Sequence, residues 1–173
     1  MRIFYTITDS PIGKLLVAAT ERGLCAVKFV HSRAAGEAAL RREYPSAEIA
    51  RDDRRLRDGV TALKDYLEGR DFARALSLDL RATAFQRRVW EALRKIPYGE
   101  TRSYREIAQA IGRPTAVRAV ARACATNPIA LLIPCHRVVR SDGGLGGYSS
   151  GIARKRKLLE HEQRRSPKSG KRA

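Results

Sequence analysis

The pattern of hydrophobic and polar positions divides the chain into two parts of different character. The first part begins with three apolar runs of five to seven residues, each bounded by turn-forming residues. Such runs are typical of short strands joined by tight turns. They lie at residues 3–8, 15–19 and 24–30. The pattern therefore predicts a small antiparallel sheet, a meander of three strands, at the start of the chain.

Two helices are expected after this sheet. Residues 34–43 favour helix by composition. A second, amphipathic helix is indicated where leucine and valine recur at three- and four-residue steps, from Leu56 to Leu67, and Gly69 is expected to end it. No polar side chains of this half converge into a reactive cluster. We therefore interpret residues 1–80 as a supporting α/β domain, with a boundary at residues 80–83.

The second part opens with strong helix signals. Thr83 and Gln86 have the spacing of a capping box, as do Ser103 and Glu106. The first box predicts a helix that stops at residues 97–99, and the second predicts a helix over 104–111 that ends at a glycine. A short connection and another helix, over 116–125, follow. Two helices joined by a tight turn that contains glycine are typical of a helix-turn-helix unit.

The second helix of this unit is unusually thin. It carries five alanines, and Arg118 and Arg122 lie one turn apart on the same face. Because the DNA minor groove is only about 6 Å wide, a helix with small side chains suits a close approach that does not read base edges. Arginine would then contact phosphates or enter the base stack. The alternative is that alanine merely favours helix and that both arginines are solvated.

The residues that could carry chemistry lie just beyond this helix. The run Ile133-Pro134-Cys135-His136-Arg137-Val138-Val139 places a thiol beside an imidazole. A reactive cysteine needs neighbours that take its proton and stabilise the thiolate. On adjacency alone, Cys135 could equally be a buried structural cysteine. The glycine-rich loop at 141–149 lacks the lysine of a phosphate-binding loop, and its glycines favour close approach of backbone amides to a ligand.

Charge supports an acidic partner for the second half. The net charge is +17, but residues 1–80 carry 14 basic and 12 acidic side chains, whereas residues 81–152 carry 12 and 4. Residues 153–173 add 9 basic and 2 acidic side chains. This asymmetry indicates nucleic acid as the partner. A last helix is expected over 153–163, followed by a basic tail at 164–173 that we expect to be disordered.

Other features set limits on location and cofactors. The three cysteines are odd in number and widely spaced, and Cys25 and Cys124 are expected to be core residues. They form no disulfide framework and no zinc-site spacing, so a reducing cytoplasm and no metal are predicted. No apolar run is long enough to span a membrane, and the first residues lack the pattern of a signal peptide.

Taken together, these residues resemble a known family. The chain is similar to the O6-alkylguanine-DNA alkyltransferases, also called methylated-DNA–protein-cysteine methyltransferases, over residues 1–163 and most densely over 83–162. The motifs that carry the resemblance are Ser103-Tyr104, Arg118-Ala119-Val120, Asn127-Pro128, Pro134-Cys135-His136-Arg137-Val138, Gly147-Tyr148-Ser149 and Leu158-Leu159. The resemblance implies a ribonuclease-H-like N-terminal α/β domain. It implies a mainly α, winged-helix-like C-terminal domain at 81–163.

The resemblance also implies roles for the residues of the reactive segment. Cys135 would be the alkyl acceptor, and His136 would remove its proton through a bound water. Glu162 would orient His136, as carboxylates orient imidazoles in other triads. Glu160 is a competing carboxylate, but Glu162 stands at the family's position. His161, beside Glu162, is interpreted as a surface residue. Asn127 would order the turn around the acceptor.

The resemblance assigns substrate contacts as well. Tyr104 would contact the flipped base, donate a proton to it and rotate its phosphate, while Arg118 would fill the gap left in the stack. Backbone groups of Val138, Ser149 and Cys135 would grip the guanine edge. The other contacts to DNA or to the base are implied for Ser103, Thr115, Ala116, Ala119, Arg122, Arg137 and Tyr148.

The expected function is therefore DNA repair by a protein that acts once per molecule. It would flip O6-alkylguanine, and O4-alkylthymine, out of duplex DNA at a cost of roughly a few kcal/mol and move the alkyl group to Cys135. The product is a thioether, which offers water no carbonyl to attack. No cofactor is implied, the partner is double-stranded DNA that contains alkylated guanine, and a monomer is expected. Tolerance for larger alkyl groups is left open at Ser150.

Two other functions fit parts of the sequence. A lesion binder without transfer activity, or a helix-turn-helix regulator, would share the helix pair, but alkyltransferase-like binders replace the acceptor cysteine and this chain keeps it. A cysteine hydrolase could use Cys135 and His136, but it would explain neither the charge nor the helix pair.

Overall fold

A mixed four-stranded sheet forms the N-terminal part of the structure, a computed structural model that describes residues 1–70 and 76–166. Its strands are β1 Arg2–Thr8, β2 Leu15–Ala19, β3 Leu24–Phe29 and β4 Glu48–Arg51, in the order β3-β2-β1-β4. The predicted antiparallel meander of β1, β2 and β3 is present. The prediction of a purely antiparallel sheet is wrong, because β4 pairs parallel to β1. As a short edge strand with no fully buried residue, β4 gives little periodic signal.

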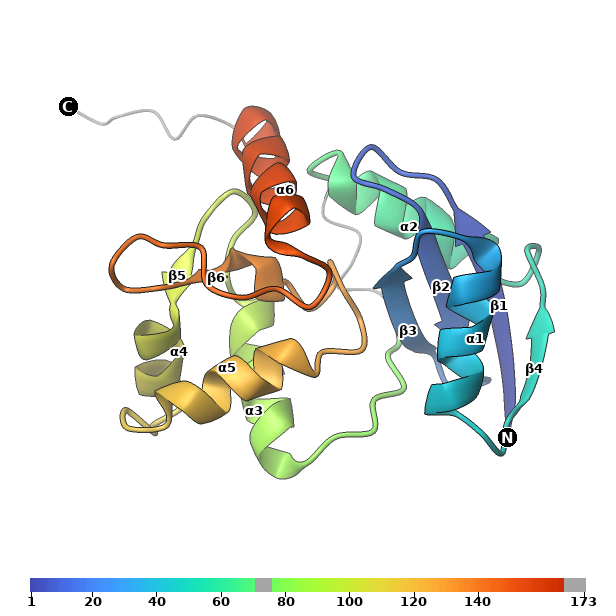
Figure 1. Cartoon of the computed structure of the whole chain (residues 1–173), viewed down its shortest axis with the longest axis horizontal. Helices are drawn as coiled ribbons and strands as arrows, with labels where there is room; N and C mark the ends of the chain where they lie inside the picture. Colours follow the sequence, from blue (N-terminus) through green and yellow to red (C-terminus); the bar gives the residue numbers. More distant parts are fainter. Residues whose placement is uncertain (71–75, 167–173) are drawn as a thin grey trace.

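Two helices cover opposite faces of the sheet. Because side chains alternate along a strand, Ile3 faces α1 (Arg33–Glu43) and Phe4 faces the side of α2 (Arg57–Leu67). Both helices were expected from the sequence at nearly these bounds. The core on the α2 side continues into the C-terminal part of the chain, so α2 lies between the sheet and the helical part (Figure 1).

The C-terminal part is mainly helical. Its elements are α3 Ala84–Arg94, β5 Arg102–Ser103, α4 Tyr104–Ala110, α5 Val117–Ala125, the 3-10 turn η2 Cys135–Arg137, β6 Val138–Val139 and α6 Ile152–Arg165. Both predicted capping boxes are formed, at the starts of α3 and α4. Helices α4 and α5 pack on each other and on α3 to make the predicted helix-turn-helix unit (Figure 1). The parallel pair β5–β6, two residues in each strand, was not predicted.

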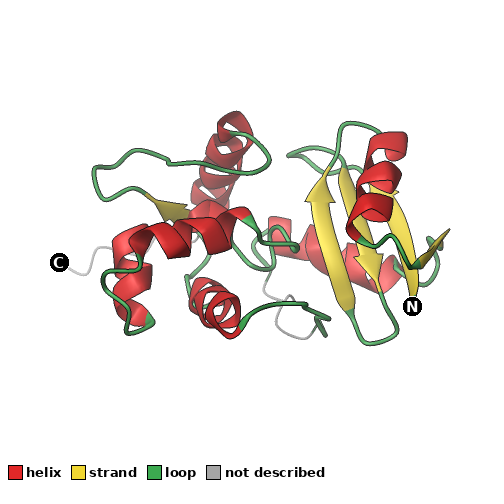
Figure 2. Ribbon diagram, turned by 60° about the horizontal axis from the view of Figure 1, so that its bottom comes forward, coloured by secondary structure: helices red, strands yellow, loops and turns green. Residues whose placement is uncertain are grey.

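The segment that follows α5 joins the two parts. The Val27 N–H donates to the Pro128 carbonyl at 3.0 Å, and the Ala130 N–H donates to the Val27 carbonyl at 2.9 Å. Strand β3 therefore holds the segment that leads to Cys135, and the sheet and the helical part lie side by side (Figure 2). Across the described ranges, no helix has both the length and the apolar content needed to cross a bilayer.

The end of the chain differs in part from the prediction. Helix α6 continues to Arg165, so the first two residues of the predicted tail are helical. Arg165 pairs with Glu68 of the N-terminal part at 3.1 Å, which explains why the helix extends that far. Residues 167–173 of the predicted tail lie outside the described residues.

The capping box of α3 gives a stability prediction. Replacing Thr83 with Ala removes the oxygen that accepts the Gln86 N–H at 3.2 Å, so the free energy of unfolding should fall by about 1 kcal/mol. Thr61→Ala is the matched control, because Thr61 is exposed inside α2 and bonds only back to the Arg57 carbonyl. Urea unfolding of both variants checks this, and an equal loss in the two would contradict it.

Candidate active site

The candidate reactive cysteine, Cys135, lies on a buried turn. Residues 129–133, which precede it, are all buried, and Cys135 itself is 5% exposed. The turn is tightened by two backbone hydrogen bonds, from the Cys135 N–H to the Ile133 carbonyl at 2.7 Å and from the Arg137 N–H to the Pro134 carbonyl at 2.9 Å. Residues 135–137 form a 3-10 turn, so Cys135 and His136 do not point to opposite faces as they would on an extended strand.

Asn127 binds this turn at three places. Its side-chain N–H groups donate to the Ile133 carbonyl at 2.8 Å and to Cys135 Sγ at 3.1 Å, while its carbonyl accepts the Ile129 N–H at 2.9 Å. A donor aimed at sulfur stabilises the thiolate more than the thiol. The structure thus places Asn127 where it can both order the turn and favour ionisation of Cys135.

The next residue on this turn, His136, pairs its imidazole with a buried carboxylate. His136 Nε2 is 2.6 Å from Glu162 Oε1, and both side chains are almost fully buried. Burial lowers the pKa of His136, so the ring is neutral at pH 7. Burial would raise the pKa of Glu162, but His136 and Arg137 outweigh it and lower that pKa to about 2. Glu162 is therefore a carboxylate that can stabilise an imidazolium, and the competing Glu160 is exposed.

Arg137 belongs to this buried cluster and not to a DNA surface. Its Nε donates to Glu162 Oε2 at 2.8 Å, its Nη2 to Oε1 at 2.9 Å, and its Nη1 to the Ile96 carbonyl at 2.7 Å. The side chain is 3% exposed. The expectation that Arg137 contacts DNA is wrong, because a guanidinium paired bidentately with a buried carboxylate does not reach solvent.

A cavity of about 290 Å³ opens onto the thiol. Its size is near the lower end of the range for small-molecule pockets. Its lining comes from α4, α5, the acceptor turn and the glycine-rich loop, and consists of Tyr104, Ala121, Cys124, Ala125, Cys135, Gly147, Tyr148 and Ser149. Cys124 is buried as expected, but it also lines this cavity. Of the predicted substrate contacts, Tyr104, Tyr148 and Ser149 are brought together with Cys135.

Burial sets the protonation states around this cavity. It raises the pKa of Cys135, although the Asn127 hydrogen bond and the charge of Lys155 oppose the shift. It also raises the pKa of Tyr104 to about 12. At neutral pH both groups therefore carry their protons. The thiol needs a base before it can attack, and the phenol is available as a proton donor.

The sequence matches one family over both parts of the chain. Residues 3–80 match the description "6-O-methylguanine DNA methyltransferase, ribonuclease-like domain", and residues 84–164 match "6-O-methylguanine DNA methyltransferase, DNA binding domain". The chain belongs to the 6-O-methylguanine DNA methyltransferase family. The resemblance inferred from the motifs is thereby confirmed.

The curated relatives include a longer, bifunctional protein and a protein that the chain covers almost completely. The chain is 47% identical over 162 residues to the bifunctional transcriptional activator/DNA repair enzyme Ada of Escherichia coli, covering 94% of this chain and 46% of that protein. The chain thus spans about half the length of that relative. It is 44% identical to a methylated-DNA–protein-cysteine methyltransferase of Methanosarcina barkeri, covering 93% of this chain and 98% of that one.

Solved structures of the family have the same fold. The O6-methylguanine methyltransferase of Mycobacterium tuberculosis superposes with a TM-score of 0.79 at 42% identity, covering 96% of each chain. A structure of the Mycobacterium tuberculosis protein in complex with DNA gives a TM-score of 0.76 at 41% identity, covering 97% of this chain and 96% of that one. The two-part architecture, a small sheet with helices followed by a helical part, is therefore that of the family.

The helix pair of this family member presents the expected cations. Arg118 and Arg122 are exposed on α5, and Thr115 is exposed in the connection before it. The small residues Ala116 and Ala119 are partly covered. Ser103 caps α4 by accepting the Glu106 N–H at 3.1 Å, so its hydroxyl already has a structural partner.

Sequence reasoning missed a buried lysine next to the cavity. Lys155 has no exposed surface, and its ammonium donates to the carbonyls of Val138 at 2.6 Å, Leu145 at 2.5 Å and Gly147 at 3.2 Å. It therefore ties the glycine-rich loop to the acceptor strand. The signal was its position three residues before Leu158, on the inward face of α6.

Two further residues differ from expectation or were overlooked. His161 was interpreted as a surface residue, which is wrong: it is 3% exposed, and its Nε2 lies 2.7 Å from the Leu67 carbonyl. Tyr66 was not singled out, yet its hydroxyl accepts a hydrogen bond from Arg137 Nη2. The recurring leucines of α2 mark its buried face, and Tyr66 lies on that face between Leu63 and Leu67.

The low pKa of Glu162 predicts an acid-sensitive core. A carboxyl group whose pKa is lower in the folded state stabilises the protein above the unfolded pKa and loses that contribution as pH falls through the folded pKa. The free energy of unfolding should therefore drop between about pH 5 and pH 2. Glu162→Gln should be less stable at neutral pH and lose less over that window. Denaturant unfolding at several pH values checks this, and parallel curves for the two proteins would contradict it.

Proposed function

We propose that this protein repairs DNA by moving an alkyl group from O6 of guanine to its own Cys135. The observation that carries the proposal is the thiol of Cys135 at a cavity wall, on the same 3-10 turn as His136, whose ring pairs with the Glu162 carboxylate at 2.6 Å. The family and the methyltransferase relatives support the same reaction. The substrate proposed is double-stranded DNA that contains alkylated guanine, bound by one copy of the chain without a cofactor.

DNA binding would use the helix-turn-helix face. The exposed Arg118 and Arg122 on an alanine-rich α5 favour close, sequence-independent contact with the backbone and the minor groove. The alkyl group on O6 is hidden in the duplex, so the base must be extruded into the cavity. Arg118 would occupy the gap that the base leaves. Thr115, Ala116, Ala119 and Ser103 would contact the backbone on the same face.

The cavity would hold the extruded base by its edges. Tyr104 and Tyr148 provide aromatic walls, and Ser149 and the backbone of Cys135 would offer hydrogen-bonding groups to the guanine edge. The backbone of Val138, which is buried and does not line the cavity, would complete this set. The Val138 carbonyl already accepts from Lys155, so its remaining lone pair would serve the base. The same cavity would admit O4-alkylthymine.

The transfer itself is a displacement at carbon. A water would carry the proton of Cys135 to Nδ1 of the neutral His136, and Glu162 would stabilise the imidazolium that forms. The thiolate then attacks the alkyl carbon: the sulfur–carbon bond forms as the carbon–O6 bond breaks, and the electron pair goes to the purine. Tyr104 would donate a proton to the ring, so guanine leaves neutral. The thioether product makes the reaction irreversible, one transfer per molecule.

Finer features of the fold belong to the same proposal. We infer a ribonuclease-H-like arrangement for the N-terminal sheet, supported by the family description and by the mixed sheet with helices on both faces. We infer that the α3–α4–α5 unit with the β5–β6 pair corresponds to a winged helix. The division into 1–80 and 81–163 is supported by the two matched ranges.

Transfer to Cys135 can be tested by mass. Incubation with duplex DNA that contains O6-methylguanine should add one methyl group to the peptide that holds Cys135 and should stop after one equivalent. Cys135→Ser should take up no methyl group and still bind DNA. Folded protein that gains no methyl group, or that gains it on another residue, would sink the proposal.

The role of Arg118 is tested by comparing two substrates. Arg118→Ala should slow repair of duplex DNA by tenfold or more, roughly the effect of losing 1.4 kcal/mol or more of stabilisation, and should leave reaction with the free base O6-methylguanine nearly unchanged. Arg42→Ala, at an exposed site on α1, controls for the loss of one positive charge. Equal slowing on both substrates would contradict a role in base extrusion. Rates come from single-turnover measurements.

A further inference from the structure

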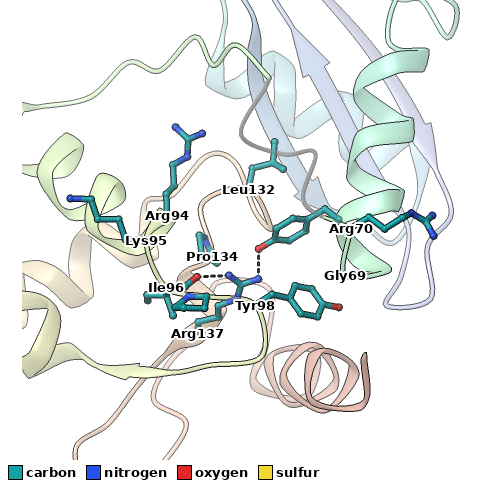
Figure 3. A pocket seen from close by; sticks show the side chains of 11 residues that line it. Gly69, Arg70, Arg94, Lys95, Ile96, Tyr98, Leu132, Pro134 and Arg137 are labelled. Atoms are coloured by element: carbon teal, nitrogen blue, oxygen red, sulfur yellow. Dashed lines mark hydrogen bonds between the residues drawn. The ribbon is translucent and has the colours of Figure 1, made fainter. Parts of the chain in front are cut away.

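The C-terminal end of α2 reaches the buried charges behind the acceptor. Tyr66, 8% exposed, accepts a hydrogen bond from Arg137 Nη2, and the guanidinium carbon lies 5.4 Å from the centre of the Tyr66 ring. Figure 3 shows Arg137 turned into this contact beside Tyr98. These residues line a second cavity of about 220 Å³, which shares no lining residue with the cavity at Cys135.

Other contacts at the same place hold the backbone of α2, and the guanidinium of Arg137 also lies over the ring of Tyr98, 5.3 Å from its centre. The Tyr98 hydroxyl donates to the Leu67 carbonyl at 2.9 Å, and His161 Nε2 lies 2.7 Å from the same oxygen. The Tyr98 ring packs edge-on against Tyr66 with centroids 5.9 Å apart. Tyr98 and His161 thus contact the backbone at the end of α2, and Tyr66 connects the same end to the Arg137–Glu162 ion pair.

The hydrogen bonds of Arg137 show why the Tyr66 hydroxyl matters. Its Nε and Nη2 bind the two oxygens of Glu162, its Nη1 binds the Ile96 carbonyl, and Nη2 also binds Tyr66. A guanidinium is a rigid fork, so an acceptor on one arm fixes the direction of the others. Loss of the hydroxyl would leave a buried N–H without this acceptor, which favours a shift of the whole group.

We propose that Tyr66 is a positioning residue for alkyl transfer: from α2 it fixes Arg137 against Glu162, and so aligns the carboxylate with the imidazole of His136. The proposal rests on the function proposed for Cys135 and His136. It connects the N-terminal part of the chain to the proposed reaction through a chain of contacts from Tyr66 to Arg137, Glu162 and His136.

The charges around His136 give the proposal a pH signature. The charged groups that act on the ring come from α6 and from the 3-10 turn itself: Glu162 and Lys155 from α6, and Arg137 from the turn. Burial lowers the pKa of His136, Glu162 raises it, and Arg137 and Lys155 lower it further. If Arg137 moves away, its opposition to the imidazolium weakens. The pKa of His136 then rises, and the ring accepts the thiol proton only at higher pH.

The test compares Tyr66→Phe with Tyr98→Phe. Each variant removes one hydroxyl from the same contact and keeps its ring, but only the first removes an acceptor from Arg137. Single-turnover methyl transfer from O6-methylguanine duplex DNA is measured across a range of pH. Tyr66→Phe should react about tenfold more slowly at neutral pH, with the acid limb of its pH profile moved to higher pH. Tyr98→Phe should lower the melting temperature and keep the wild-type pH profile.

Two further measurements separate this inference from the proposed function. The rate of Cys135 alkylation by iodoacetamide, followed against pH, should show the same shift in Tyr66→Phe without any DNA. Wild-type protein that takes no methyl group would overturn the function and leave this readout intact. Arg137→Lys, which keeps a cation but loses the fork, should move the acid limb in the same direction. Unshifted profiles in Tyr66→Phe and Arg137→Lys, or equal shifts in both tyrosine variants, would overturn the inference.

Discussion

The buried carboxylate of Glu162 is the charge around which the buried polar groups next to Cys135 are arranged. It accepts from His136 and twice from Arg137, and the Gly99 N–H donates to it at 3.2 Å. A carboxylate in an apolar interior is costly unless its oxygens are fully paired. Pairing on every side therefore fixes where α6, the acceptor turn and the loop after α3 can lie. The positions of the thiol and of the imidazole follow from that constraint.

This arrangement resolves a conflict within the site. The proposed attack on carbon needs the thiolate of Cys135, yet burial raises the pKa of this thiol and keeps it protonated. Exposure to water would lower the pKa, but it would also open the cavity in which we propose that the flipped base binds. The structure instead keeps the sulfur buried, with the Asn127 donor 3.1 Å from it and the neutral imidazole of His136 on the same turn, paired with the carboxylate of Glu162. In the proposed mechanism, ionisation of the thiol therefore depends on proton transfer to His136.

The C-terminal part of the chain presents the exposed cations, whereas the N-terminal part supports the buried groups. The exposed arginines and small residues of α5 face the solvent, where a polyanion can bind. The sheet carries almost no net charge of its own, and β3 and α2 hold the acceptor segment and the ion pair from behind. Buried Lys155 also supports the site: its ammonium donates to two carbonyls of the glycine-rich loop and to the Val138 carbonyl of β6. Local rigidity around the thiol therefore comes from elements far apart in the sequence.

The sequence by itself determined the local structure and the identity of the reactive group. Capping boxes, apolar periodicity and turn residues are short-range signals, so the helices and the first three strands lie close to their predicted bounds. The motif around Cys135 was equally local. The edge strand β4, the burial of Arg137 and His161, and the roles of Lys155 and Tyr66 were decided only by the tertiary structure. A polar side chain is exposed or buried according to the partners that it meets. The partners of Arg137 lie 25 to 71 residues away in the chain, and the Leu67 carbonyl that His161 contacts lies 94 residues away. No local pattern encodes such pairings, because they exist only once the two parts of the chain have packed together.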